Sequence, residues 1–200
     1  MRDEIIQKRG YASSTKGDVL SLKISSYPVT AKYLAERLAQ NGNSICELCC
    51  GIGISLIEFS NNFEHVIGVD NHAEVMKSAQ DNLQSAGVKN CELLLGSADD
   101  SSVLSKIKAD IVAYDIPYWS NHDDNLLSKN PQLSEMIQLI KSSITENIVV
   151  YLPAEFSFEN ANGLADTFEY QEVWIDGKHD RNFIYFGNLI HTHGYTKVTF

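Results

Sequence analysis

The sequence predicts one α/β domain: a doubly wound, mostly parallel sheet with helices on both faces and an antiparallel hairpin at its C-terminal end. Two observations carry this prediction. Short, continuously apolar strands alternate with helices between residues 44 and 152, which is typical of a parallel sheet buried on both faces. Two further strand-like segments lie close together near the C-terminus, and a loop that short joins antiparallel strands.

An arm with a leader helix, residues 1–40, is expected ahead of the main domain at residues 41–200. Residues 29–40 have apolar side chains at helical spacing, and Thr30 is a suitable N-cap. Seven strands are expected, at residues 44–49, 65–69, 91–95, 110–114, 147–152, 169–175 and 182–190. Helices are expected between them, at residues 54–61, 73–86, 101–107 and 132–143. The crossovers between parallel strands should be right-handed.

The composition is that of a folded domain in a reducing compartment. The chain has 200 residues, 44% of them hydrophobic and 21% charged, which is enough to bury a core. No apolar run approaches the ~20 residues that cross a bilayer, and residues 1–10 do not read as a secretory signal, so we expect a cytoplasmic protein without a membrane partner. Three of the four cysteines fall within residues 46–50, in an expected buried strand, which favours core thiols over disulfides or a metal site.

Charge is spread unevenly along the chain. The formal net charge is −10, which argues against broad binding to a polyanion. Residues 1–37 nevertheless carry seven Lys or Arg and four acidic residues, a balance of +3, and the rest of the chain carries −13. This basic arm can contact a few phosphates, or it can be an ordinary solvated segment, which is the commoner role of such charges.

The segment E-L-C-C-G-I-G, from Glu47 to Gly53, lies between the first strand and its helix and indicates a ligand-binding turn. Glycines at 51 and 53 allow a tight turn and a close approach of a ligand to the backbone. The next strand ends in Asp70, 19 residues after Gly51, where a carboxylate can accept hydrogen bonds from a ribose. Alternatively, Glu47 caps a backbone turn and Asp70 caps the following helix. A nicotinamide enzyme prefers a third glycine, which this segment lacks.

A second segment, D-I-P-Y-W, directly follows the expected strand at residues 110–114. Ligands of α/β sheets bind at the carboxyl ends of central strands. Asp115 can accept hydrogen bonds from an exocyclic amine of a nucleobase, which favours the tetrahedral nitrogen that attacks a methyl group. Pro117 makes the turn rigid, and the ring of Tyr118 can stack on the base. The alternative is a solvent-exposed turn in which Trp119 covers the edge of the core.

In this order, these residues resemble the class I S-adenosylmethionine-dependent methyltransferases that carry a D/N/S-P-P-Y/W motif and methylate exocyclic amines. The chain is most similar to the trimethylguanosine synthase family, the RNA cap guanine-N2 methyltransferases. The similarity covers about residues 26–190 and includes Y-P-V-T-A-K-Y-L-A, E-L-C-C-G-I-G, I-T-E-N-I-V-V-Y-L-P and F-I-Y-F-G-N-L-I. The resemblance implies a Rossmann-like fold, an S-adenosylmethionine cofactor and an RNA or nucleotide substrate.

The resemblance also assigns site residues. It places Thr30, Glu47, Cys50, Gly51 and Gly53 around the methionine part of the cofactor, Asp70 at the ribose with Asn71 beside it, and Ser97 and Ala98 at the adenine. It makes Asp115, Pro117 and Tyr118 the methyl-transfer pocket, and Trp119, Asn121 and His122, which follow, are candidate substrate contacts. No metal is implied.

The chain departs from the family at the transfer motif. Asp115 and Ile116 stand where the family has Ser and Pro, and Tyr118 stands where it has the Trp that stacks on the cap. The prediction of the cofactor is therefore stronger than the prediction of cap specificity. Two alternatives stay open: an N-methyltransferase of a small molecule or a protein, which the acidic body favours, and a non-catalytic module that binds S-adenosylmethionine. The oligomeric state cannot be read from the sequence.

Overall fold

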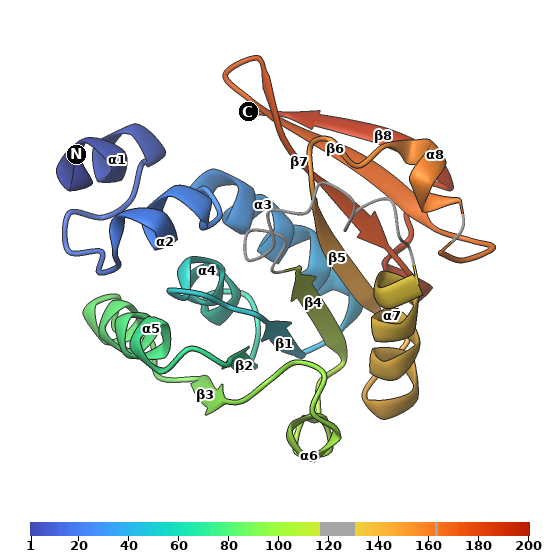
Figure 1. Ribbon diagram of the computed structural model, residues 1–200, viewed down its shortest axis with the longest axis horizontal. Helices are drawn as coiled ribbons and strands as arrows, with labels where there is room; N and C mark the ends of the chain where they lie inside the picture. The colour runs from blue at the N-terminus through green and yellow to red at the C-terminus, as the bar shows by residue number, and fades with distance from the viewer. Residues whose placement is uncertain (117–130, 163) are drawn as a thin grey trace.

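The computed structural model describes residues 1–116, 131–162 and 164–200 of the chain (Figure 1). Within them, eight strands form one sheet in the order β3-β2-β1-β4-β5-β7-β6-β8. The strands are β1 (Ser44–Leu48), β2 (His65–Asp70), β3 (Cys91–Leu95), β4 (Ile111–Asp115), β5 (Ile148–Pro153), β6 (Glu169–Ile175), β7 (Lys178–Tyr185) and β8 (Gly194–Thr199). β7 pairs antiparallel with β5 and β6, and the other pairs of this sheet are parallel. The predicted α/β fold is confirmed.

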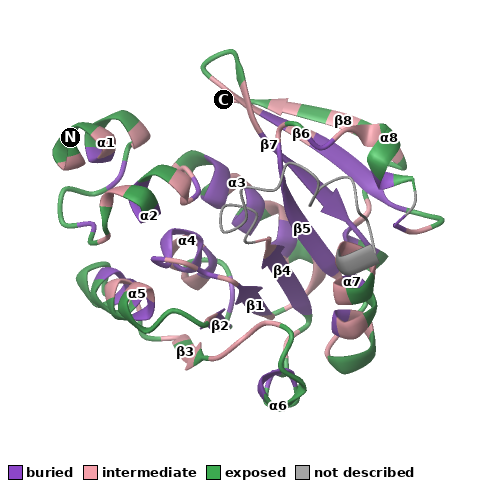
Figure 2. Cartoon of the chain, viewed as in Figure 1, coloured by how far each residue is buried: buried purple, intermediate pink, exposed green. Residues whose placement is uncertain are grey.

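The structure contains a strand, β8, that is not among the seven strands predicted from the sequence. It pairs in parallel with β6 at the edge of the sheet, and its side chains alternate between half-buried and exposed. Such an edge strand, G-Y-T-K-V-T, contains no continuous apolar run, so the pattern that identifies buried strands does not detect it. Figure 2 shows the contrast between β8 and the central strand β5, which is buried throughout.

Helices cover both faces of the sheet. One face carries α3 (Pro28–Leu38), α4 (Ile54–Ser60) and α5 (Ala73–Ser85), and the other carries α6 (Ser101–Leu104), α7 (Pro131–Ser143) and α8 (Phe158–Ala161). Alternate residues of each strand enter the two cores: Ile111 and Ala113 of β4 pack on the α3 side, and Val112 and Tyr114 on the α7 side. Among the described residues, no helix combines the length and apolarity needed to cross a membrane.

The C-terminal hairpin is tighter than the sequence suggests. β6 and β7 are joined by Asp176 and Gly177 alone, both at positive φ (50° and 73°), the conformation of a two-residue hairpin turn. The expected loop over residues 176–180 is therefore wrong at its C-terminal end, because β7 already begins at Lys178. As a result, Arg181 is a strand residue instead of a loop residue.

Two short helices, α1 (Arg2–Arg9) and α2 (Val19–Ile24), precede α3 and pack on the ligand-binding turn. Tyr11 and Leu22 form a small core with Ile52 and Ile54, which lie at the end of that turn. A buried side chain on α5, Asn82, strengthens the contact. It bonds to the backbone N–H and C=O of Lys16 and to the C=O of Ile52.

The helix α3 begins before the position that the sequence indicates. Pro28 lies in its first turn and Tyr27 is its N-cap, so the predicted N-cap role of Thr30 is wrong. A proline at the first helical position has a helical φ already and needs no amide acceptor, which explains the earlier start. Thr30 instead lies inside the first turn and is buried.

Candidate active site

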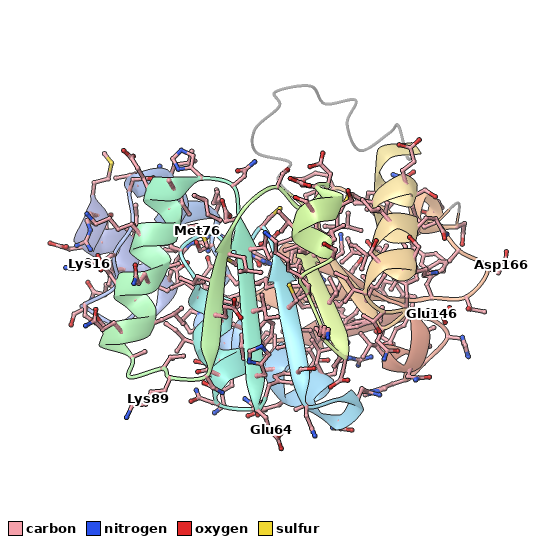
Figure 3. All side chains as sticks on the ribbon, turned by 90° about the horizontal axis from the view of Figure 1, so that it is seen from below. Lys16, Glu64, Met76, Lys89, Glu146 and Asp166 are labelled. Atoms are coloured by element: carbon pink, nitrogen blue, oxygen red, sulfur yellow. The ribbon has the colours of Figure 1, made fainter. Side chains whose placement is uncertain are left out.

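The predicted site residues that the structure describes lie mostly along one edge of the sheet. The strands β1 to β5 are parallel, so their carboxyl ends share this edge, which we call the carboxyl edge. Figure 3 shows it at the top, and Glu64 and Lys89, which precede β2 and β3, lie at the opposite edge. Asp70 and Asp115 are the last residues of β2 and β4, and Ser97 follows the end of β3; the strand order places them along this edge in the order Ser97, Asp70, Asp115.

The ligand-binding turn between β1 and α4 is held by Asp70. Gly51 and Gly53 have positive φ (55° and 77°), which glycine adopts without strain. The Gly51 N–H donates to Asp70 Oδ2 at 3.0 Å, and the His72 N–H donates to Asp70 Oδ1 at 2.9 Å. Asp70 therefore braces both loops, and its side chain remains half-buried at the surface. A Cβ on Gly51 would meet no atom of the described residues within 4 Å, so those residues leave space next to the turn.

Two other residues of the turn face the protein interior. The Cys50 thiol is buried beside Met76, with Sγ 3.9 Å from the Met76 sulfur, and its N–H donates to the C=O of Val69. A Cβ on Gly53 would come within 3.3 Å of the Ala79 side chain, so this glycine allows close packing of the turn on α5. Cys50 and Gly53 thus pack the turn against the protein interior, and the described residues leave space for a ligand next to Gly51.

Glu47 is buried in β1, where its carboxyl interacts with the hydroxyls of Ser55 and Tyr151. It is 2% exposed, and its Oε2 has no hydrogen-bond partner among the described residues. The same holds for Thr30 Oγ1, and the Tyr151 hydroxyl on β5 interacts with the Glu47 carboxyl without a well-formed hydrogen bond. Burial raises the pKa of Glu47 to about 8, and repulsion from Asp115 adds to the rise. Because buried polar atoms are almost always bonded, these oxygens are suited to hydrogen bonds with a polar ligand.

Asp115 ends β4 beside Glu47 and Tyr151. Its neighbours in the sheet set this arrangement: Asp115 is in register with Tyr151, and Glu47 with Ala113. Burial raises the pKa of Asp115 to about 6; the positive charge of Arg181 opposes this rise, and Asp180 and Asp70 add to it. A carboxyl in such surroundings is typical of a functional site.

The adenine side of the predicted site follows β3. The Ser97 hydroxyl donates to the Asp99 carboxylate, and Ala98 packs partly against the α7-side core. Gly96 N–H donates to the C=O of Asp70, which ties this loop to the end of β2. The loop therefore lies next to Asp70, as a nucleoside that reaches from ribose to adenine requires.

The remaining candidates of the transfer motif, Pro117, Tyr118, Trp119, Asn121 and His122, lie outside the described residues. Asn71 is exposed directly after β2. The structure adds two residues that sequence reasoning does not assign to the site, Tyr151 and Arg181. Tyr151 lies within an apolar strand and gives no sequence signal, and Arg181 is hidden by the misplaced hairpin loop.

The described residues fit S-adenosylmethionine. This cofactor has a positively charged methionine part, a ribose diol and an adenine. The unpartnered oxygen of Glu47 suits a cationic donor, the open side of Gly51 leaves room for the chain of the ligand, and Asp70 can receive the diol. These features occur in the same order along the carboxyl edge as in the cofactor.

The sequence matches the model of a protein family, and the fold matches solved structures. The model of RNA cap guanine-N2 methyltransferases matches residues 42–172. A protein of Gloeobacter violaceus named as an uncharacterised RNA methyltransferase is 28% identical over 92 residues, which are 44% of this chain and 20% of that protein.

Among solved structures, a methyltransferase from Porphyromonas gingivalis W83 has a TM-score of 0.76 at 18% identity and covers 96% of this chain, which spans 48% of that protein. An rRNA methylase from Streptococcus thermophilus has a TM-score of 0.56 at 12% identity, over 80% of this chain and 95% of that protein. Both share the Rossmann-like fold that the resemblance implies.

The segment that the family model matches contains the ligand-binding turn, Asp70 and Asp115, and it extends from the start of β1 into β6. It also exceeds half of the chain. The chain therefore belongs to the RNA cap guanine-N2 methyltransferase family, and the predicted resemblance to that family is confirmed.

Proposed function

We propose that this chain transfers a methyl group from S-adenosylmethionine to an exocyclic amine of a nucleobase in RNA, with the 2-amino group of guanine as the acceptor. One observation carries the proposal: the half-buried carboxyl of Asp115 ends β4, the strand next to β1 and its ligand-binding turn. The family assignment supports RNA and guanine-N2 as the substrate class, and the relative from Gloeobacter violaceus is named as an RNA methyltransferase.

The proposed chemistry assigns Asp115 a positional and electrostatic role. When bound, the cofactor supplies an electrophilic methyl group on a positively charged sulfur. The guanine amine is a poor nucleophile, because its lone pair is delocalised into the ring. Asp115 accepts a hydrogen bond from this amine, localises the lone pair and offsets the positive charge that develops on nitrogen. With a pKa of about 6, Asp115 is mostly a carboxylate at pH 7 and can accept such a bond.

The cofactor contacts follow the geometry of the carboxyl edge. We assign Glu47 and Thr30 to the methionine part, because each has a buried oxygen without a partner among the described residues. The open turn at Gly51, with Cys50 and Gly53 shaping it from below, receives the same part of the ligand. Asp70 and Asn71 are assigned to the ribose, and Ser97 and Ala98 to the adenine.

The substrate contacts rest on the sequence. Pro117 and Tyr118 complete the transfer pocket, with the Tyr118 ring stacking on the base, and Trp119, Asn121 and His122 contact the substrate. We place the reaction in RNA processing in the cytoplasm. The proposed arm, residues 1–40, lies beside the ligand-binding turn through α1 and α2, where its basic residues can meet RNA phosphates.

The test uses S-adenosylmethionine tritiated on its methyl group. The purified chain is incubated with total RNA, total protein or a metabolite extract, and labelled RNA is digested to nucleosides. We expect label in RNA as N2-methylguanosine. Asp115→Asn should lower kcat by about 10²-fold and leave cofactor affinity, measured by calorimetry, nearly unchanged. Asp70→Ala is the matched control, because it should weaken cofactor binding instead.

A second candidate is an N-methyltransferase of a small molecule or a protein, which the net charge of −10 favours. Label confined to metabolites or protein would support it and contradict the RNA proposal. Cofactor binding without transfer to any of the three pools would indicate a non-catalytic module. Full kcat in Asp115→Asn would contradict the amine-orienting role even if RNA is the substrate.

A further inference from the structure

Arg181 is buried at the carboxyl edge, and the proposed reaction assigns it no role. It is only 5% exposed, and a guanidinium stays protonated at any physiological pH. A buried, permanent positive charge is costly unless it has partners that use it. The groups that interact with this charge therefore indicate its role.

The strand register places Arg181 on the same face of the sheet as the acidic site residues. Arg181 is in register with Pro153 on β5, two positions after Tyr151, which is itself in register with Asp115. Side chains two residues apart on a strand point to the same face. Glu47 shares that face, because it is in register with Ala113, two positions before Asp115. Four strands thus contribute Glu47, Asp115, Tyr151 and Arg181 to one surface.

Two contacts anchor the guanidinium of Arg181. Its Nε donates to Asp180 Oδ2 at 2.8 Å, and its Nη1 donates to the hydroxyl of Ser26 at 2.9 Å. Ser26 is buried and directly precedes the N-cap of α3. The planar fork is therefore fixed by the hairpin on one side and by the segment before α3 on the other, which leaves it little rotamer freedom.

The other charges near Asp115 are nearly all acidic. Three carboxyls among the described residues interact with Asp115: Asp70 on β2, Glu47 on β1 and Asp180 on β7. Its described neighbours with an ionisable thiol or hydroxyl group are Cys49, Tyr114 and Tyr151. Arg181 is the cation that interacts with both Glu47 and Asp115 in the described part of the chain. A carboxylate in this setting needs a fixed cation to remain ionised.

We propose that Arg181 is a positioning residue for methyl transfer: anchored by Asp180 and Ser26, it keeps a fixed positive charge on the face that carries Asp115 and so keeps the Asp115 side chain in its carboxylate form. This inference rests on the proposed function, because it gives Asp115 the acceptor role. Arg181 itself does not contact the methyl group. It acts through Asp115, whose charge would otherwise be lost to burial and to repulsion from Asp70 and Asp180.

The experiment measures the ionisation of Asp115 directly. The chain is labelled with ¹³C at aspartate carboxyls, and NMR titrations are recorded for wild type, Arg181→Gln, Arg181→Lys and Lys178→Gln, with Asp115→Asn used for assignment. We expect Arg181→Gln to raise the pKa of Asp115 by about one unit, a tenfold change in proton affinity. Arg181→Lys should retain most of the wild-type value. Lys178→Gln, which removes an exposed charge from the same strand, should have no effect.

The pH profile of methyl transfer gives a second measurement. In Arg181→Gln the acid limb of kcat should move up by about the same unit, whereas a merely structural role would lower the rate equally at every pH. An unchanged pKa of Asp115 in folded Arg181→Gln would overturn the inference. A pKa of Asp115 that rises as much in Arg181→Lys as in Arg181→Gln would also overturn it, because lysine keeps the positive charge. If Asp115 titrates as expected but no RNA is methylated, the proposed function fails and the electrostatic role of Arg181 stands.

Discussion

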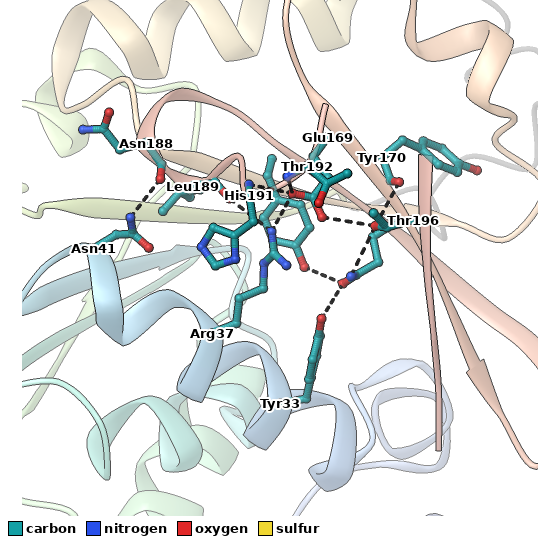
Figure 4. Close-up of polar contacts among 12 residues, drawn as sticks. Tyr33, Arg37, Asn41, Glu169, Tyr170, Asn188, Leu189, His191, Thr192 and Thr196 are labelled. Carbon is teal, nitrogen blue, oxygen red and sulfur yellow. Dashed lines mark hydrogen bonds and ion pairs between the residues drawn. The ribbon is translucent and has the colours of Figure 1, made fainter. Parts of the chain in front are cut away.

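Two buried glutamates on the α3 side of the molecule have opposite surroundings. Glu169, at the start of β6, is 1% exposed, and both of its oxygens are bonded. Oε2 accepts from Arg37 at 2.7 Å and from the backbone N–H groups of His191 and Thr192, and Oε1 accepts from the Thr196 hydroxyl (Figure 4). Glu47 is 2% exposed, and one of its oxygens has no partner among the described residues.

The different hydrogen bonding of Glu169 and Glu47 indicates that the first has a structural role and the second a role in binding. The Glu169 cluster joins α3, β6 and the segment before β8, and the Arg37 guanidinium also lies 4.1 Å from the ring centre of Tyr185. A buried carboxylate that is fully bonded contributes to the fold. A buried carboxyl without partners costs stability, and a protein retains such a group when a ligand completes it. Burial alone therefore does not identify a site. One unmet atom does not either, because Arg37 Nε in the Glu169 cluster also has no partner among the described residues; the carboxyl edge differs in that its unmet oxygens lie beside Asp115 and the ligand-binding turn.

The largest expected effect is the loss of the Glu169 charge. Glu169→Gln leaves Arg37 buried beside a neutral group, and breaking a buried ion pair costs about 3 kcal/mol. For a chain of this size that corresponds to a fall in Tm of roughly 6–12 °C. Urea unfolding followed by circular dichroism measures the change. A stability equal to wild type would show that the two glutamates do not differ as described.

The corresponding substitution at the candidate site, Glu47→Gln, should raise the stability of the fold instead of lowering it. Glu47→Gln removes a group whose folded state holds a proton that the unfolded state has released, so we expect a gain of about 2 kcal/mol at pH 7. Cofactor binding should weaken by at least about tenfold, because a charge-assisted hydrogen bond is lost. Unfolding and titration calorimetry on one sample measure both. A variant that is less stable and binds normally would contradict the comparison.

The pH dependence of stability sharpens the comparison further. The pKa of Glu47 is raised to about 8 and that of Asp115 to about 6, so between the ordinary carboxyl range and these values the folded state binds more protons. Stability without cofactor should therefore fall as pH rises from 5 to 8, by up to about 1.4 kcal/mol per pH unit for each group. Glu47→Gln should flatten the fall between pH 6 and 8. Stability that rises over this range in wild type would contradict the raised values.

Much of the fold could be predicted from the sequence, because buried parallel strands are apolar along their whole length. The segment at residues 148–153 follows that rule throughout, and the segment at residues 44–48 follows it except at Ser44 and Glu47; the structure has strands at both. The half-exposed strand β8 does not follow it, and neither does the start of β7, where Lys178, His179 and Asp180 are polar. Pattern reasoning therefore fails where a strand lies at an edge or enters a polar site.

The site could be predicted in part for a related reason. Gly51 and Asp70 have a sequence signature because a tight turn and a strand-end acid recur at fixed spacing. The structure brings them together through the Gly51 N–H bond to Asp70. Tyr151 and Arg181 have no such signature, because their place at the site depends on strand register across β5. Long-range register is a property of the folded sheet, which a local motif does not contain.

The smallest expected effect comes from two buried tyrosines that differ only in their hydroxyl partners. Tyr185 is fully buried, and its hydroxyl donates to Gln171 Oε1 at 2.9 Å in the Glu169 cluster. Tyr151 is 1% exposed, and its hydroxyl has no hydrogen-bond partner among the described residues. Tyr185→Phe should therefore cost about 1 kcal/mol, since it also leaves a buried amide oxygen with one bond fewer. Tyr151→Phe should have a smaller effect, because the Tyr151 hydroxyl interacts with the Glu47 carboxyl but makes no well-formed hydrogen bond in the described part of the chain.

The two tyrosine variants are a strict test because the substitution and the burial are the same. Urea unfolding at pH 7 without cofactor compares them with wild type, and a repeat at saturating cofactor separates the site from the scaffold. If the Tyr151 hydroxyl bonds to the bound ligand, Tyr151→Phe loses part of the stabilisation that cofactor provides, whereas Tyr185→Phe keeps all of it. Equal losses in both variants, with and without cofactor, would mean that unmet bonding capacity at the carboxyl edge has no connection with ligand binding.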